Sequence, residues 1–201
     1  METTGDVTRM RLVGGNLALD FVNTRVGPPD GPPDDDALTG YPELLAWAVH
    51  AGALTEAEAA PLHRGAGTAA AFARALRTRD HLDGTFRALA AGREPSAATL
   101  ARLRDDGVDA LRHASLARGD AFVWSWREDR TTGRPLRPVV HAALHLLTTG
   151  PLERIKGCAG CSFLFLDESK NRSRRWCSMD DCGAAAKMRR YVAARRTRTA
   201  H

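Results

Sequence analysis

Four cysteines near one end of this 201-residue chain constrain its structure more than any other feature. Cys158, Cys161, Cys177 and Cys182 have the spacing C-x2-C-x15-C-x4-C. Two close cysteine pairs separated by about 15–20 residues are typical of a tetrahedral zinc site. Because four thiolates leave no coordination position open, the spacing predicts one structural Zn2+ and not a catalytic metal. Disulfides are the alternative, but the first residues contain no apolar run, so we expect no secretory signal and no oxidising compartment.

Basic residues are concentrated in the same part of the chain as the cysteines. Residues 151–201 contain 12 Lys and Arg against 5 Asp and Glu, whereas residues 1–150 contain 17 against 19. A local positive excess next to a mildly acidic remainder indicates a surface for a polyanion. We therefore expect two parts, a domain over 1–150 and a basic zinc module over 151–201.

The composition allows a buried core and argues against a membrane span. Hydrophobic residues make up 43% of the chain and charged residues 26%. The longest uncharged stretch, Pro138–Leu152, has 15 residues and contains two histidines, whereas a transmembrane helix needs about 20 apolar residues. We expect a cytoplasmic protein without a membrane partner.

Helical signals dominate residues 1–150, which we expect to form a mainly α-helical domain. Asn16, Thr55 and Ser96 are placed to cap helices, and Glu58 completes a capping box with Thr55. Apolar residues at helical spacing predict helices over 41–51, 68–91, 96–104 and 139–149. The segment Gly27–Asp36 has four prolines and four aspartates, so it predicts an exposed loop.

Strand periodicity appears in two short segments. Phe122, Trp124 and Trp126 alternate with other residues, and a turn at Thr131–Gly133 would return this strand as a hairpin. We expect the two tryptophans to pack in the core, with a ligand wall or a dimer contact as alternatives. Phe163 and Phe165 alternate in the second segment, which we expect to pair with a return strand beyond Asp167.

The residues between and after the cysteines carry the candidate nucleic-acid contacts. Helix propensity continues after the metal site, with Met188, Tyr191 and Val192 as an apolar stripe that we expect to be part of the core. Arg and Asn side chains can contact bases, and Lys suits phosphates. The candidate residues are Lys170, Asn171, Arg172, Arg174, Arg175, Lys187, Arg189, Arg190 and Arg196. Solvated charge and counter-ions for the zinc thiolates are the alternative interpretation.

Residues 1–150 offer one weaker candidate site and no catalytic pattern. Asp20, Asn23 and Thr24 could line an effector pocket, but a capped helix end with satisfied polar groups is the preferred interpretation. The chain has no Gly-rich phosphate loop, no G-x-S-x-G motif and no nucleophile with a recognisable base. We do not expect an enzyme.

Two stretches resemble known families. CAGCSFLFLDESKNRSRRWCSMDDCGAAAKMRRY resembles the CGNR zinc finger of bacterial proteins, and LVGGNLALDFVNTR resembles the start of the ABATE domain that precedes that finger. The resemblance covers most of the chain and implies a stress-type transcription regulator. One departure is clear, because Cys182-Gly183 is followed by Ala184-Ala185 where the family has Asn-Arg. Any contact that those two side chains make in relatives is lost here.

These observations predict a cytoplasmic DNA-binding transcription regulator. Its helical domain would sense a small-molecule effector or dimerise, and its zinc module would supply salt-dependent phosphate contacts. One module of this size has limited specificity, so we expect a homodimer on paired half-sites. The alternatives are an adaptor whose basic helix binds an acidic protein, and an RNA-binding protein, which would need exposed aromatic residues for stacking.

Overall fold

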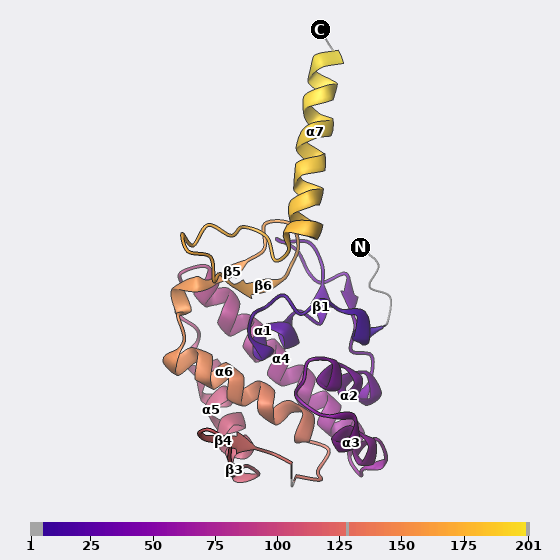
Figure 1. Ribbon diagram of the computed structural model, residues 1–201, viewed down its shortest axis with the longest axis vertical. Helices are drawn as coiled ribbons and strands as arrows, with labels where there is room; N and C mark the ends of the chain where they lie inside the picture. The colour runs from indigo at the N-terminus through magenta and orange to yellow at the C-terminus, as the bar shows by residue number, and fades with distance from the viewer. Residues whose placement is uncertain (1–5, 128, 200–201) are drawn as a thin grey trace.

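Helices form where capping residues and apolar periodicity coincide. The computed structural model describes residues 6–127 and 129–199, with side chains up to residue 195 (Figure 1). Its α-helices are α1 (Leu17–Val22), α2 (Tyr41–His50), α3 (Glu56–Ala59), α4 (Thr68–Ala90), α5 (Ala97–Arg112), α6 (Arg137–Thr149) and α7 (Ala184–Thr199). The predicted caps are confirmed: Asn16 accepts a hydrogen bond from the Ala18 amide, Ser96 accepts one from the Thr99 amide, and Thr55 and Glu58 form the capping box.

The core of the body lies between α1, α2, α4, α5 and α6 (Figure 1). Phe21 of α1 packs on Trp47 of α2 with ring centroids 5.0 Å apart, and both side chains are fully buried. α5 continues to Arg112, beyond the predicted end at Arg104, although it contains a glycine. A Cβ at Gly107 would lie 2.1 Å from the Leu144 side chain, so glycine is what allows α5 to approach α6 closely.

Among the described residues, three two-stranded antiparallel sheets accompany the helices. They are β1 (Arg25–Val26) with β2 (Asp35–Asp36), β3 (Ser115–Arg118) with β4 (Phe122–Ser125), and β5 (Ile155–Gly157) with β6 (Leu164–Leu166). The prediction that Gly27–Asp36 is entirely loop is wrong at its end, because Asp35 and Asp36 pair with β1. The buried Arg79 of α4 holds this pair in place by bonding the Asp36 carboxylate and the Thr24 hydroxyl.

Both predicted return strands are wrong, because each strand pairs backward in sequence. β4 pairs with the preceding β3 and not through Thr131–Gly133, which leads into the 3-10 turn before α6. β6 likewise pairs with the preceding β5, and the residues after Asp167 form an irregular loop. The β3–β4 connection is only residues 119–121, so this pairing costs little loop entropy. The β5–β6 connection, residues 158–163, contains the first cysteine pair, and its ends are joined by a hydrogen bond from the Cys158 amide to the Phe163 carbonyl at 2.8 Å.

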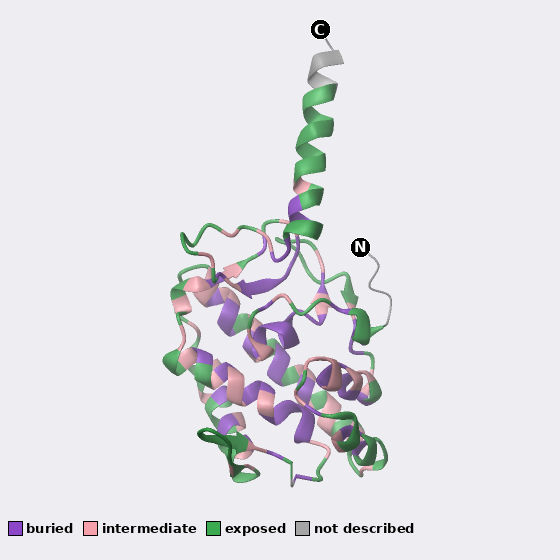
Figure 2. Cartoon of the chain, viewed as in Figure 1, coloured by how far each residue is buried: buried purple, intermediate pink, exposed green. Residues whose placement is uncertain are grey.

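The prediction that the apolar stripe of α7 belongs to the core is also wrong. α7 projects away from the body, and most of its described side chains are exposed (Figures 1 and 2). Met188, Tyr191 and Val192 are all exposed. Helical periodicity identifies a stripe on a helix, but a neighbouring element must be present to bury it.

The architecture confirms a mainly α-helical fold with small hairpins and a four-cysteine module followed by a basic helix. Gly150 and Pro151 lie between α6 and β5, where the predicted boundary at residue 150 falls. Ile155 and Leu164 beyond that boundary belong to the same buried cluster as the helices. In the part of the chain that the structure describes, no helix is both long and apolar enough to cross a bilayer.

Candidate metal centre and nucleic-acid interface

The four cysteine thiols form one buried cluster at the base of α7. Their Sγ atoms all lie within 4.8 Å of one another. The Cys161–Cys177 and Cys177–Cys182 pairs have Sγ–Sγ distances of 3.6 and 3.8 Å. A zinc–sulfur bond of about 2.3 Å in a tetrahedron places sulfurs about 3.8 Å apart. The spacing of the thiols therefore fits one Zn2+ with four sulfur ligands and no open position, which is a structural site.

Backbone amides support the sulfur atoms. The amides of Gly160 and Cys177 each donate to Cys158 Sγ at 3.3 Å, which stabilises a thiolate. A Cβ at Gly160 would lie 3.0 Å from Cys182 Cβ and 3.3 Å from its Sγ. Glycine at this position therefore lets the first cysteine pair and the last cysteine share one centre.

The thiols of the cluster shift one another's pKa values. Hydrogen bonds from the Cys161 and Cys177 thiols lower the pKa of Cys158. The bond to Cys158 raises the pKa of Cys161 to about 12, and it also raises the pKa of Cys177. One thiolate therefore opposes the formation of the next. A dication offsets this repulsion, because metal ligation deprotonates thiols outright.

The hairpin β5–β6 lies between the metal centre and the helices. The register pairs Ile155 with Leu166 and Gly157 with Leu164, which places these side chains on one face of the hairpin. Ile155 and Leu164 belong to the helical core on this face, whereas Phe165 on the other face belongs to a cluster with the cysteines. The metal centre is therefore attached to the body through a hairpin that has an apolar neighbour on each side.

The predicted pocket residues Asp20, Asn23 and Thr24 lie in this attachment. Asn23 donates from Nδ2 to the Leu164 carbonyl and accepts from the Leu164 amide, both at 2.8 Å. Asp20 accepts from the Gly14 amide at 2.7 Å, and the Gly14 carbonyl accepts from the Leu166 amide. Thr24 bonds the Phe21 carbonyl and receives a hydrogen bond from Arg79. All three residues are buried and bonded. Asn23 directly, and Asp20 through Gly14, connect the helices to β6, whereas Thr24 bonds only Phe21 and Arg79 of the helices.

A second ionic group, which the sequence analysis missed, organises the loop after β6. The buried Asp167 carboxylate accepts from Lys156 Nζ at 2.6 Å, from the Ser169 amide at 3.0 Å and from the Arg174 amide at 3.1 Å. Burial raises the pKa of Asp167, but these hydrogen bonds and the Lys156 charge outweigh it, so the net pKa is lowered. The available signal was an acidic residue directly at the end of an apolar strand.

The predicted nucleic-acid residues in this loop divide into exposed and bonded groups. Lys170, Asn171 and Arg175 are exposed, and Arg172 is exposed while pairing with Glu153 at 3.2 Å. Arg174 is half-buried: its guanidinium lies 4.4 Å from the Phe165 ring centroid and donates to the Trp176 and Cys177 carbonyls. Arg174 therefore stabilises the loop between β6 and Cys177, residues 167–176, which we call the metal loop.

Comparison with known families gives the context for this geometry. Residues 15–150 match a family model described as "ABATE: Putative stress-induced transcription regulator", and residues 154–196 match the CGNR zinc finger. The chain belongs to the ABATE family. No curated protein matches it. The ABATE match contains Asn23 and the helical core, and the CGNR match contains all four cysteines, so both expected resemblances are confirmed.

The projecting helix of the CGNR finger displays most of its basic side chains to solvent. Lys187, Arg189 and Arg190 are exposed along α7, which continues from a π-helical turn, Met179–Gly183, that holds the last cysteine (Figures 1 and 2). The side chain of Arg196 lies outside the described part of the chain. The metal centre therefore holds the N-terminal end of a basic helix that extends into solvent.

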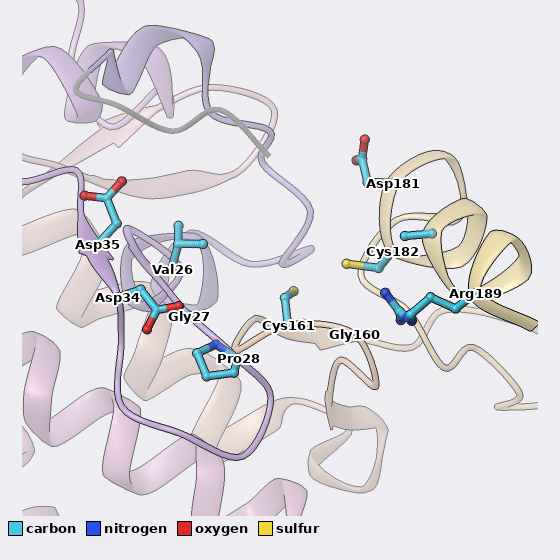
Figure 3. Close-up of a pocket in the computed structure, with 11 residues that line it drawn as sticks. Val26, Gly27, Pro28, Asp34, Asp35, Gly160, Cys161, Asp181, Cys182 and Arg189 are labelled. Carbon is cyan, nitrogen blue, oxygen red and sulfur yellow. The ribbon is translucent and has the colours of Figure 1, made fainter. Parts of the chain in front are cut away.

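A cleft of about 650 Å3 separates the base of α7 from the β1–β2 loop of the ABATE domain. Its finger side includes Ala185 and Arg189, and its ABATE side includes Val26, Asp34 and Asp35 (Figure 3). Ala185 is one of the two alanines that replace the family's Asn-Arg. Asp20, Asn23 and Thr24 do not line this cleft.

Proposed function

We propose that this ABATE protein is a DNA-binding transcription regulator in which a structural zinc orients the basic helix α7. The observation that carries the proposal is that exposed basic side chains gather on α7, away from the slightly acidic residues 1–150. α7 extends from the metal centre with exposed Lys187, Arg189 and Arg190, whereas residues 1–150 have a small acidic excess. A helix about 24 Å long at 1.5 Å per residue is long enough to lie in a major groove or to follow a phosphate backbone.

The contact set has two parts. Lys187, Arg189 and Arg190 on α7 and Lys170, Asn171, Arg172 and Arg175 on the metal loop are the proposed DNA contacts. Arg196 extends the set along α7, and Arg174 acts through the loop that it braces. We propose that phosphate contacts dominate, because the family's Asn-Arg is replaced by Ala184-Ala185 and lysine and arginine at exposed positions neutralise phosphates.

The test measures binding to duplex DNA as a function of salt with the zinc-loaded full chain. Genomic fragments retained at physiological salt supply the duplex. We expect the logarithm of the binding constant to fall linearly with the logarithm of salt concentration, and we expect Lys187→Ala and Arg190→Ala each to reduce the slope by about 1. Arg93→Ala, at an exposed position after α4, is the matched control and should leave the slope unchanged. Binding that is absent or insensitive to the α7 variants overturns the proposal.

RNA binding is the second candidate, and one observation favours it. Phe163 and Phe165 are buried, as expected, but Tyr191 is exposed on α7 beside Arg195. An exposed aromatic ring next to arginine can stack on an unpaired base. Preference for single-stranded RNA over duplex DNA, lost in Tyr191→Ala, would identify RNA as the ligand. If the protein bound neither duplex DNA nor RNA, the remaining hypothesis would be an adaptor whose basic helix binds an acidic protein.

The remaining parts of the proposal concern location, assembly and chemistry. We propose that the protein functions in the cytoplasm, where four free thiols stay reduced and available to zinc. We propose that it binds DNA as a homodimer and that it acts by binding, without catalysis. We propose that a small-molecule effector would act by changing the orientation of the finger relative to the ABATE domain.

A further inference from the structure

The hairpin β3–β4 presents an apolar face to solvent. The register pairs Leu116 with Trp124 and Arg118 with Phe122, so all four side chains lie on one face. Phe122 is 63% exposed and Trp124 is 42% exposed, and Leu116 is also exposed. The prediction of core packing for the two tryptophans is therefore confirmed for the buried Trp126 and wrong for Trp124. On the opposite face Val123 is exposed as well.

An exposed two-stranded hairpin of this kind is poorly stabilised by its own chain. An isolated hairpin is marginal in water and needs further strands or packing against another element. Trp126 fixes one end, because its Nε1 donates to the Ala110 carbonyl of α5 at 2.7 Å. Three of the four residues of β4 before this anchor, Phe122, Val123 and Trp124, have exposed apolar side chains. The hairpin therefore has the features of a binding surface, whose exposed apolar side chains a partner would bury.

Exposed apolar side chains also occur on α5, the helix that precedes the hairpin. Leu100, Val108 and Leu111 follow one stripe of this helix and are exposed, next to the buried stripe of Leu103, Gly107 and Ala110. Leu111 adjoins Ala110, the residue that receives the Trp126 hydrogen bond. Six large apolar side chains, three on that face of the hairpin and three on α5, are thus 39–63% exposed, and exposed apolar clusters of this kind are typical of protein interaction surfaces.

We propose that this surface, formed by Leu116, Phe122 and Trp124 of β3–β4 with the exposed stripe of α5, packs against the same surface of a second copy. A twofold interface must be self-complementary. The tip of the hairpin carries charges of both signs, Arg118 and Asp120, both exposed, so each copy supplies a cation and an anion to the other. The hairpin β3–β4 also lies at the opposite end of the body from α7, so a contact through the hairpin leaves both basic helices accessible (Figure 1).

The inference deepens the proposed function, since it identifies the surface of the proposed homodimer, and it is tested without DNA. Sedimentation equilibrium compares the wild type with Phe122→Ser/Trp124→Ser. Because central aromatic residues dominate interface energetics, we expect the dimer dissociation constant to rise at least 100-fold. Met188→Ser/Val192→Ser is the matched control: these side chains on α7 are 61% and 41% exposed, and their loss should leave the constant unchanged.

A second measurement uses the wild type alone, so it does not depend on the variants folding. Hydrogen exchange of the backbone amides in 115–125 should slow as protein concentration rises, while exchange in 155–166 should not change. A wild type that is monomeric at high micromolar concentration overturns both this surface and the proposed homodimer. A wild type that is dimeric, with variants equally dimeric, overturns the surface alone. Loss of DNA binding by a dimeric protein would instead overturn the proposed DNA function.

Discussion

The hairpins β3–β4 and β5–β6 have the same antiparallel topology but very different surroundings. In β5–β6 one face belongs to the helical core and the other contacts the cysteine cluster, and Phe165 is 0% exposed. In β3–β4 Phe122 is 63% exposed, although it occupies a strand of similar length and apolar character. A strand sequence alone therefore does not decide burial. The neighbours of its two faces do.

The comparison also shows what each hairpin requires from outside the polypeptide. One face of β5–β6 contacts the cluster of four thiols, so we expect the hairpin to depend on the zinc that this cluster would bind. β3–β4 has no equivalent ligand site among the described residues, where the four cysteines are the one group suited to a metal. The proposed second copy supplies for β3–β4 what zinc supplies for β5–β6.

Removal of zinc should give the largest effect, and it should act on β5–β6 and on the base of α7 while leaving β3–β4 unchanged. Chelation, or Cys177→Ser, is expected to lower the free energy of unfolding by more than about 5 kcal/mol, since structural zinc contributes about 10–16 kcal/mol in isolated finger peptides. Thermal unfolding followed by circular dichroism measures the loss, and added Zn2+ should restore stability to the chelated wild type. Unchanged unfolding after chelation would show that β5–β6 does not need the metal.

Truncation of one phenylalanine in each hairpin gives the most direct comparison. Phe165→Ala should cost about 3–5 kcal/mol, because it leaves a cavity between the metal cluster and the loop braced by Arg174. Phe122→Ala should change the stability of the monomer by no more than about 0.5 kcal/mol. Urea denaturation at a protein concentration below that of dimerisation measures both. Equal costs would remove the distinction between the hairpins.

The attachment of β6 to the ABATE domain predicts the next effect. Asn23→Ala leaves the Leu164 amide and carbonyl without their side-chain partner in a buried position and should cost about 2–4 kcal/mol. Asn171→Ala, at an exposed position in the metal loop, is the control and should leave stability unchanged while weakening DNA binding. If Asn23→Ala were as stable as the wild type, the attachment would depend on apolar contacts alone.

The pH dependence of stability should show a smaller contribution from Asp20, which supports β6 through Gly14. Burial raises the pKa of Asp20 from its ordinary value of 3.8 to about 6. The folded protein therefore binds the proton more tightly than the unfolded chain, and stability falls as pH rises from about 4 to 6. At 1.36 kcal/mol per pKa unit, the loss is up to about 3 kcal/mol.

Asp20→Asn tests this contribution because it keeps the oxygen that accepts from the Gly14 amide. We expect the variant to be more stable than the wild type by about 1–3 kcal/mol at pH 7, and we expect the difference to vanish near pH 4. Urea denaturation at a series of pH values measures the difference. A constant difference across this range would show that Asp20 keeps an ordinary pKa.

Local signals in the sequence were sufficient for the metal centre and for the helices. The C-x2-C-x15-C-x4-C spacing predicted the ligand cluster, and the caps at Asn16 and Thr55 predicted helix starts, because each depends on residues close in sequence. Properties that depend on distant residues were not predictable. The exposure of Tyr191, the partner of β4 and the bonds from Asn23 to Leu164 all depend on which elements meet in space.

At the junction between the metal centre and α7, a small change in angle produces a large displacement at the far end of the helix. Cys182 lies in the π-helical turn from which α7 starts, so the coordination geometry at this sulfur sets the direction of a rod about 24 Å long. A tilt of about 10° at the pivot displaces the far end by about 4 Å, which exceeds the 3.4 Å separation of stacked base pairs. On the proposed DNA duplex, a tilt of this size would therefore move the far end of α7 by about one base-pair step.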